Sequence, residues 1–218
     1  MKKAIITISG GIDSTLTAAI AKEEGYELYF LTANYGQRNL QREINNTTYL
    51  AEYFKAKKHK IIDMTWLGAL GNSMITDSTI EVDPDNDHQI YVPFRNTCIL
   101  SAAIAWAETD VDIKRIYIGS DGESESVCPD NSPQYIKACN NLIKVSTKLN
   151  KNVKIVAPLN YLTKPEIIAK AVKYDIPFQH TWTCVSSSQK ACGLCDPCRA
   201  RKEAFLKLGL CDPISYEN

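Results

Sequence analysis

Apolar and polar positions alternate along the chain in a pattern that predicts strands and helices in turn. Short apolar runs predict five strands, at residues 4–8, 27–32, 59–63, 115–119 and 153–158. Apolar residues at helical spacing, or helix-start signals, predict helices at residues 14–23, 37–54, 96–107 and 163–174. The segment 96–107 is apolar on nearly every side, which predicts a buried helix. We therefore expect an α/β fold, a doubly wound, mostly parallel five-stranded sheet with helices on both faces.

Two segments interrupt this alternation. Residues 68–92 are polar and acidic, and loops of that length often serve as lids. The chain from residue 180 onward is rich in cysteine and has the character of an appendage. We expect a Rossmann-like nucleotide-binding domain at residues 1–179 and a small four-cysteine region at residues 180–218.

Composition narrows the classes of function. Of 218 residues, 44% are hydrophobic and 23% charged, which is typical of a globular domain. The 25 basic residues equal the 25 acidic ones, so no overall positive field favours nucleic acid or an anionic membrane. No signal-peptide core and no apolar run of the ~20 residues that cross a bilayer is present. These features predict a cytoplasmic protein without a stable nucleic-acid or membrane partner.

The first predicted strand ends in a glycine turn that leads into a helix. The turn reads Ile8-Ser9-Gly10-Gly11-Ile12-Asp13-Ser14-Thr15. Its glycines allow the backbone to approach a phosphate, and the helix N-terminus favours negative charge. The hydroxyl groups of Ser9 and Ser14 add donors, and Asp13 can hold Mg²⁺. An ordinary Gly-Gly turn is the alternative, but the complete Ser-Gly-Gly-x-Asp-Ser pattern is more specific to a phosphate site.

Four of the eight cysteines are close together in the sequence: Cys184, Cys192, Cys195 and Cys198. Four thiolates with CxxC spacing suit tetrahedral zinc, and a complete sulfur shell leaves no open position for catalysis. An iron–sulfur cluster is the alternative, because CxxCxxC also occurs in ferredoxins. For the scattered Cys98, Cys139 and Cys211 we expect ordinary packing as small buried residues.

The glycine turn resembles the pyrophosphatase loop of the adenine-nucleotide alpha-hydrolase superfamily, which implies that ATP is cleaved to AMP and pyrophosphate with Mg²⁺. Further segments resemble the 7-cyano-7-deazaguanine synthase family over residues 4–213: Tyr35-Gly36-Gln37-Arg38, Tyr91-Val92-Pro93-Phe94-Arg95-Asn96, Thr163-Lys164-Pro165-Glu166 and Cys192-Gly193-Leu194-Cys195-Asp196-Pro197-Cys198. This resemblance implies that 7-carboxy-7-deazaguanine, ammonia and ATP yield the nitrile through an adenylated acid and an amide. It also implies zinc on the four cysteines and a homodimer.

The resemblance and the chemistry of the side chains together indicate candidate site residues. For catalysis we expect Asp13, Arg38, Arg95 and Lys164, because guanidinium groups bind carboxylate or phosphate and an ammonium neutralises phosphate charge. For substrate binding we expect Tyr35, Gln37, Arg38, Arg95, Asn96, Ser126, Pro129 and Asp130. Taken singly, these could also be a surface arginine, a packed tyrosine or a helix-starting lysine.

One segment, Ser124 to Tyr135, departs from the family pattern. The family's Gly, Tyr, Cys and Arg are replaced by Val127, Cys128, Asn131 and Ser132, and an earlier Asp is Ser124. Because this loop is expected to face the substrate, the pocket should differ. A relative that stops at the amide, or joins the acid to another amine such as a protein N-terminus, for example in antiviral defence, is therefore an alternative.

Two further classes of function fit the sequence less well. An RNA thiolase of the same superfamily would need a catalytic cysteine pair outside the metal site and usually an added RNA-binding domain. A non-catalytic nucleotide-binding module with zinc conflicts with the intact Ser9, Asp13 and Ser14.

Overall fold

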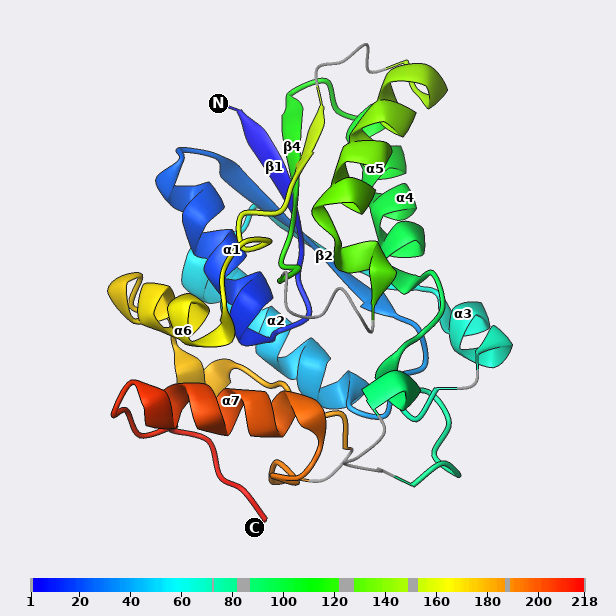
Figure 1. Cartoon of the computed structure of the whole chain (residues 1–218). Helices are drawn as coiled ribbons and strands as arrows, with labels where there is room; N and C mark the ends of the chain where they lie inside the picture. Colours follow the sequence, from blue (N-terminus) through cyan, green and yellow to red (C-terminus); the bar gives the residue numbers. More distant parts are fainter. Residues whose placement is uncertain are drawn as a thin grey trace.

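The computed structural model describes residues 2–71, 73–81, 87–121, 128–148, 153–186 and 189–217. They form three layers, a central sheet with helices on each of its two faces (Figure 1). All strand pairings are parallel, in the order β3-β2-β1-β4-β5. The strands are β1 (Lys3–Thr7), β2 (Glu27–Asn34), β3 (Lys58–Asp63), β4 (Ile113–Ile118) and β5 (Lys154–Val156). The predicted doubly wound sheet is confirmed.

Helices cover both faces of the sheet. One face carries α1 (Ile12–Glu23), α2 (Leu40–Phe54), α6 (Lys164–Lys173) and α7 (Asp196–Lys207). The other carries α4 (Arg95–Glu108) and α5 (Pro133–Ser146). The short elements are α3 (Thr65–Leu70) and the 3₁₀ turns Asp87–Ile90, Pro129–Asn131 and Phe178–His180. No helix in the described ranges is both long and apolar enough to cross a membrane.

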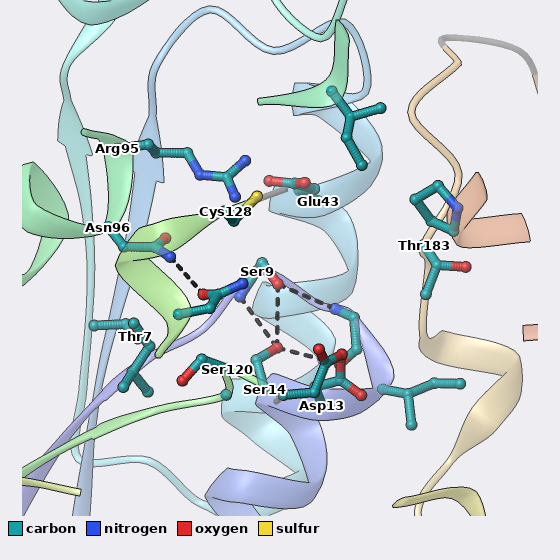
Figure 2. A pocket seen from close by; sticks show the side chains of 18 of the residues that line it. Thr7, Ser9, Asp13, Ser14, Glu43, Arg95, Asn96, Ser120, Cys128 and Thr183 are labelled. Carbon is teal, nitrogen blue, oxygen red and sulfur yellow. Dashed lines mark hydrogen bonds between the residues drawn. The ribbon is translucent and has the colours of Figure 1, made fainter. Parts of the chain in front are cut away.

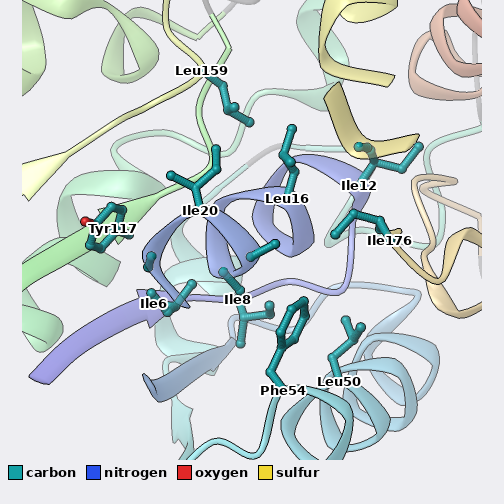
Figure 3. Packing of buried hydrophobic residues seen from close by; sticks show 14 of the residues in the cluster. Ile6, Ile8, Ile12, Leu16, Ile20, Leu50, Phe54, Tyr117, Leu159 and Ile176 are labelled. Atoms are coloured by element: carbon teal, nitrogen blue, oxygen red, sulfur yellow. The ribbon is translucent and has the colours of Figure 1, made fainter. Parts of the chain in front are cut away.

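Side-chain alternation along β1 divides the core between the two faces. Ile6 points to the layer of α1 and α2, whereas Ile5 points to the layer of α4 and α5. Figure 3 shows the first cluster, in which Leu16 of α1 and Phe54 of α2 surround β1. This packing holds α1 against β1, so that the N-terminus of α1 lies at the carboxyl end of the strand.

Several sequence predictions need correction in detail. The helix at 96–107 is not buried on all sides: α4 buries a face that includes Leu100 and Trp106, while Ser101 faces solvent, because α4 lies in an outer layer. Helices α3, α5 and α7 were not predicted. The capping box at the start of α6 is confirmed, with Thr163 N–H donating to Glu166 Oε2 at 2.8 Å.

The region from residue 180 onward packs closely on the sheet domain. Helix α7 lies against α6, and Phe205 belongs to the same cluster as Ile167. Cys184 and Trp182 are buried with Tyr35 at the carboxyl edge of the sheet. The boundary at residues 179 and 180 stays a prediction, and the two sides of it share a hydrophobic core.

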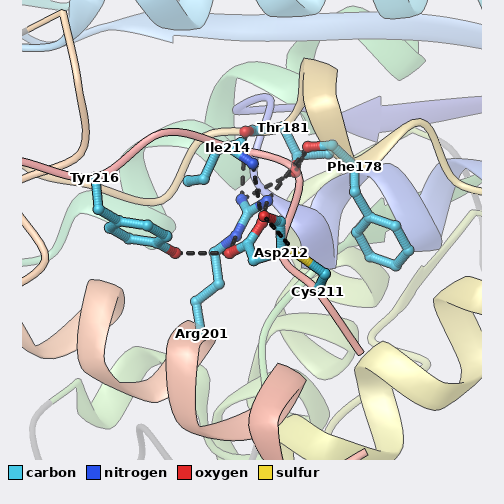
Figure 4. Close-up of polar contacts among 7 residues, drawn as sticks. All are labelled: Phe178, Thr181, Arg201, Cys211, Asp212, Ile214 and Tyr216. Carbon is cyan, nitrogen blue, oxygen red and sulfur yellow. Dashed lines mark hydrogen bonds and ion pairs between the residues drawn. The ribbon is translucent and has the colours of Figure 1, made fainter. Parts of the chain in front are cut away.

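A buried arginine anchors the end of the chain (Figure 4). Arg201 of α7 is 1% exposed, and its Nε and Nη2 donate to the two carboxylate oxygens of Asp212 at 2.7 and 2.8 Å. Its Nη1 donates to Thr181 Oγ1 at 3.0 Å, and Tyr216 donates to Asp212 at 2.6 Å. This network joins α7, the C-terminal tail and the segment that precedes Cys184.

Candidate active site

A cavity of about 570 Å³ opens at the carboxyl ends of the central strands. The connections of β1 and β4 lead to opposite sides of the sheet, and in doubly wound folds ligands bind in the crevice that this arrangement leaves. The walls come from the turns after β1 and β4, from α2 and α4, and from residues 182–185 and α7. Figure 2 shows polar side chains converging on this space.

The turn after β1 forms the floor of the cavity. Gly10 has a φ of +78°, a conformation that favours glycine. The hydroxyl groups of Ser9 and Ser14 lie 3.2 Å apart, and the N-cap residue of α1 is Gly11, which has no side chain to cap the helix. The N–H groups of that first turn are therefore available to an anion.

Gly119, after β4, lets a second turn approach this floor. A Cβ atom at Gly119 would lie 2.7 Å from the backbone nitrogen of Ser14. Any larger residue would push the β4 turn away from the N-terminus of α1. The close approach brings Ser120 and Asp121 to the edge of the glycine turn after β1 (residues 8–15), which we call the phosphate turn.

One ammonium group lies between two carboxylates at the centre of the site. Lys164 Nζ is 2.7 Å from Asp13 Oδ2 and 3.0 Å from Asp121 Oδ2. Burial lowers the pKa of Lys164, but the charges of Asp13 and Asp121 outweigh that effect and raise it. Burial likewise raises the pKa of Asp13 against the attraction of Lys164. The group can neutralise phosphate charge and is always cationic near neutral pH.

Some buried polar atoms of cavity residues have no partner within the described part of the chain. They are Asp13 Oδ1, Asn39 Oδ1, Trp182 Nε1 and Thr183 Oγ1. Burying such atoms unpaired is costly, so a polar ligand is the natural complement of the cavity. The backbone N–H of Trp182 donates to Gly10 O at 2.8 Å, which holds this wall against the phosphate turn.

Arg95 and Tyr35 form the wall opposite the phosphate turn. Arg95 Nη1 donates to Tyr35 Oη at 3.2 Å, and its guanidinium lies 5.4 Å from the centre of the Tyr35 ring. Burial raises the pKa of Tyr35 to about 12. Next to Arg95, the backbone N–H of Asn96 donates to Asp130 Oδ2 at 3.0 Å, and Asn96 Nδ2 donates to Asn131 Oδ1 at 2.8 Å.

Glu43 of α2 is a cavity residue that the sequence analysis missed. Its side chain is buried, and Gln37 Nε2 donates to its Oε2 at 2.7 Å. Burial raises the pKa of Glu43 to about 7, although Gln37 and the charge of Arg95 act to lower it. A signal was present: Glu43 shares the buried stripe of α2 with Thr47, Leu50 and Phe54, at spacings of four, three and four residues.

The structure brings most of the predicted residues together, but not all. Within the described ranges, the cavity is lined by Ile8, Ser9, Gly11, Ile12, Asp13, Ser14, Tyr35, Arg95, Asn96 and Lys164. Six other predicted residues are not part of the lining in the described part of the chain: Gly10, Thr15, Gln37, Arg38, Pro129 and Asp130. Ser126, like residues 122–127 as a whole, is outside the described residues.

Arg38 is placed differently from its expected role as a clamp. Its guanidinium donates to the backbone carbonyls of Asp77 and Ile80, and its backbone N–H donates to Ile75 O at 2.9 Å. These contacts fasten the segment 75–80 to the end of β2. Residues 68–92 are thus partly folded in their described portions, with Ile75 buried beside the cavity; their function as a lid stays a prediction.

Two substituted residues of the loop that departs from the family pattern face the cavity. Cys128 and Asn131 both contribute to its lining. Burial raises the pKa of Cys128, so its thiol is protonated near neutral pH. The departures in sequence therefore bear directly on the substrate space.

The four clustered cysteines form a compact sulfur site beside the cavity. The Sγ atoms of Cys184, Cys192, Cys195 and Cys198 all lie within 4.8 Å of one another. Tetrahedral bonds of about 2.3 Å place ligand sulfurs about 3.8 Å apart, so the cluster fits one metal ion. A four-iron cluster would hold the thiolates further apart. Backbone N–H groups of Cys192 and Ser186 approach Cys184 Sγ at 3.3 and 3.4 Å, as suits a thiolate.

Solved structures with the same fold include two synthetases. NMN synthetase from Francisella tularensis matches with a TM-score of 0.52 and 15% identity, covering 96% of this chain and 78% of that one. A 4-thiouridine synthetase, solved with RNA and bound ATP, matches with a TM-score of 0.52 and 18% identity over 94% of this chain and 53% of that one. At these identities the likeness shows the fold alone.

Sequence relatives cover the whole chain. The 7-cyano-7-deazaguanine synthase of Chlorobium phaeobacteroides is 40% identical over 220 aligned positions, covering 99% of this chain and 97% of the relative. The enzymes of that name from Oceanobacillus iheyensis and Methanosphaerula palustris are 38% and 37% identical, with 99% of this chain covered in each case. The model of the family described as queuosine biosynthesis protein QueC matches residues 3–209. The phosphate turn, the sulfur site and this agreement along the chain show that the protein belongs to the QueC family.

Proposed function

We propose that the protein uses ATP and ammonia to convert 7-carboxy-7-deazaguanine into 7-cyano-7-deazaguanine. The observation that carries this proposal is the Asp13–Lys164–Asp121 arrangement beside the phosphate turn, within a chain that is similar throughout to enzymes of that name. The cavity offers the backbone N–H groups and hydroxyls of the phosphate turn, together with the Lys164 ammonium, to the phosphates of ATP. It also has a separate wall, around Arg95, for an acid.

The reaction proceeds in two activations. A carboxylate oxygen attacks the α-phosphorus of ATP, forming a C–O–P linkage as pyrophosphate leaves. Ammonia then attacks the carbonyl carbon, AMP leaves, and the amide forms with loss of a proton. The amide oxygen then attacks the α-phosphorus of a second ATP as pyrophosphate leaves, and loss of AMP and the two N–H protons gives the nitrile. In this proposal the Lys164 ammonium, beside the phosphate turn, balances charge on the phosphates in both activations.

Two metals fit this proposal. Asp13 and Asp121 would hold Mg²⁺, consistent with the unpartnered Asp13 Oδ1. When bound, Mg²⁺ neutralises phosphate charge. The four cysteines would hold zinc, which closes its own sulfur shell and stabilises the wall next to the phosphate turn.

A second activity has support from one observation. Cys128 and Asn131 face the cavity where the family pattern has other residues. A changed wall suits a different amine, so transfer of the activated acid to another amine, or release of the amide, is the alternative outcome of the same chemistry.

Mass analysis of one incubation tests the proposal. Protein, Mg²⁺, ATP, ¹⁵N-ammonia and 7-carboxy-7-deazaguanine should yield ¹⁵N-labelled nitrile and two AMP per nitrile. Release of AMP with accumulation of the labelled amide would favour the alternative. No consumption of ATP with this acid would overturn the proposal. Asp13→Asn, with the phosphate turn otherwise intact, should abolish AMP formation in either case.

A further inference from the structure

Glu43 has no part in the activation chemistry described above, yet its carboxylate lies in the cavity. The residue is 9% exposed, and one of its oxygens accepts the hydrogen bond from Gln37. Gln37 is itself fixed: its Oε1 accepts the backbone N–H of Tyr35 at 2.9 Å, and its Nε2 also donates to Ala33 O at 3.0 Å. The Glu43 carboxylate is therefore a positioned acceptor.

The guanidinium of Arg95 shares this part of the cavity. It enters from the start of α4 and is held by Tyr35, whereas Glu43 enters from α2. The two groups are close enough that the charge of Arg95 lowers the pKa of Glu43. Figure 2 shows both side chains directed into the space beyond Ser9. The cavity thus presents a fixed donor and a fixed acceptor near each other.

The contact with Gln37 does not by itself require a charge at position 43. A glutamine there could accept the same hydrogen bond from Gln37 Nε2. A carboxylate that is costly to bury is instead characteristic of a functional site. Burial raises the pKa of Glu43 to about 7, which reflects that cost.

We propose that Arg95 and Glu43 together read the guanine-type edge of the substrate ring, an inference that rests on the proposed function. That edge presents a carbonyl oxygen, a ring N–H and an exocyclic NH₂, which is one acceptor followed by two donors. Arg95 donates to the carbonyl oxygen. Glu43 accepts from the two nitrogen donors, because an ionised carboxylate has about four acceptor positions and the side chains of Gln37 and Asn39 use only part of them.

This pairing also separates the acid substrate from the adenine of ATP. An adenine edge places NH₂ where guanine has its carbonyl oxygen, and a bare ring nitrogen where guanine has N–H. Arg95 would then face a donor, and Glu43 would face an acceptor. The adenine ring of ATP therefore binds poorly at this end of the cavity, and the phosphates of ATP stay at the phosphate turn.

The test compares two ligands on the whole, metal-loaded protein by calorimetry, with a non-hydrolysable ATP analogue present. The ligands are 7-carboxy-7-deazaguanine and the same molecule without its 2-amino group. Wild-type protein should bind the first about 10- to 100-fold more tightly, the value of one or two charge-assisted hydrogen bonds. In Glu43→Gln the NH₂ group of the new side chain faces the ring N–H, so two donors oppose each other. The ratio of the affinities for the two ligands should therefore fall to within about threefold.

A control and the contrary outcomes complete the design. Glu52→Gln removes a charge from the exposed side of the same helix and should keep the full preference. If Glu43→Gln does not fold, Glu43→Asp replaces it, and the wild-type ratio can overturn the inference without any variant. Equal binding of both ligands by wild type, or an unchanged preference in Glu43→Gln, overturns the inference and leaves the proposed function standing. Wild-type protein that binds the ATP analogue but not the acid overturns both.

Discussion

Lys164 and Asp13 are 151 residues apart in the sequence, and their charged atoms lie 2.7 Å apart in the cavity. The contact joins the first turn of α6 to the first turn of α1, which directly follows the two glycines of the phosphate turn. Since Asp121 shares the same ammonium, one cation balances two carboxylates that come from different strand ends.

Replacing this lysine tests its electrostatic role. Lys164→Gln should lower the rate of AMP formation about 100-fold or more, because a group that stabilises developing charge is lost. Single-turnover kinetics at saturating ATP measure the effect on chemistry. Lys173→Gln, on the exposed side of the same helix, is the control and should retain activity. Activity within threefold of wild type in Lys164→Gln would contradict the assignment.

Metal removal should loosen the wall of the active site. The four sulfurs are buried or half-buried in the cluster that includes Tyr35 and Trp182, so losing the ion exposes thiolates to one another inside this core. We expect one zinc per chain by elemental analysis, and chelation or Cys195→Ser should lower Tm by on the order of 10 °C. Cys211 is exposed, so the expectation that it packs as a small buried residue was wrong, and Cys211→Ser should leave Tm unchanged. Iron in the purified protein, with absorbance near 400 nm, would show the assignment to be wrong.

Glu43 should make stability depend on pH in a defined direction. Its folded pKa is raised by burial from 4.5 to about 7, so the folded state holds a proton that the unfolded state has already released between these values. Protonation of Glu43 in the folded state adds to the free energy of unfolding. This added stability is complete below about pH 4.5 and is lost as the pH rises through 7, a decrease of about 3 kcal/mol. Denaturant unfolding from pH 4.5 to 8 measures it, with Glu43→Gln as the comparison.

The variant isolates this effect from that of other acids. Burial also raises the pKa of Asp13 and Asp130, and both contribute equally to wild type and Glu43→Gln. The difference in unfolding free energy between the two proteins should therefore change across this pH range. A constant difference would mean that Glu43 ionises in the folded protein as it does in the unfolded chain.

Breaking the Arg201–Asp212 pair should be among the most destabilising single changes. Asp212→Asn leaves the guanidinium of Arg201, 1% exposed, without its anion. A buried charge deprived of its partner costs about 3–5 kcal/mol, which corresponds to a fall in Tm of about 10 °C. Thermal unfolding provides the measurement, and Glu203→Gln on the exposed face of α7 is the control. A loss below about 1 kcal/mol would show that the tail is not anchored by this pair.

The local signals in the sequence predicted the central architecture well. Each strand of the sheet follows from a short apolar run, and the capping box at Thr163 and Glu166 marks the start of α6. These features depend on neighbouring residues. The four cysteines were likewise identified by spacing, and the structure brings their sulfurs together.

The parts that were missed depend on contacts between distant segments. Helix α7 begins directly after Cys195, with Pro197 in its first turn, and that proline was a usable signal masked by the metal motif. Arg38 shows the converse, because its sequence context favoured a ligand role while its contacts are with the carbonyls of Asp77 and Ile80. Hydrogen bonds of this kind arise only when the chain is folded and have no local signature.

The hydrogen bond from Trp182 to Gly10 has a consequence for how the protein is made. The phosphate turn leaves the ribosome well before residues 182–185 and α7, which supply the wall beside it. A nascent chain that has not yet reached these residues therefore carries its phosphate turn without this wall of the cavity. The complete cavity therefore forms only after residues 182–207 have been synthesised, and a metal on the adjoining cysteines would act on the same wall.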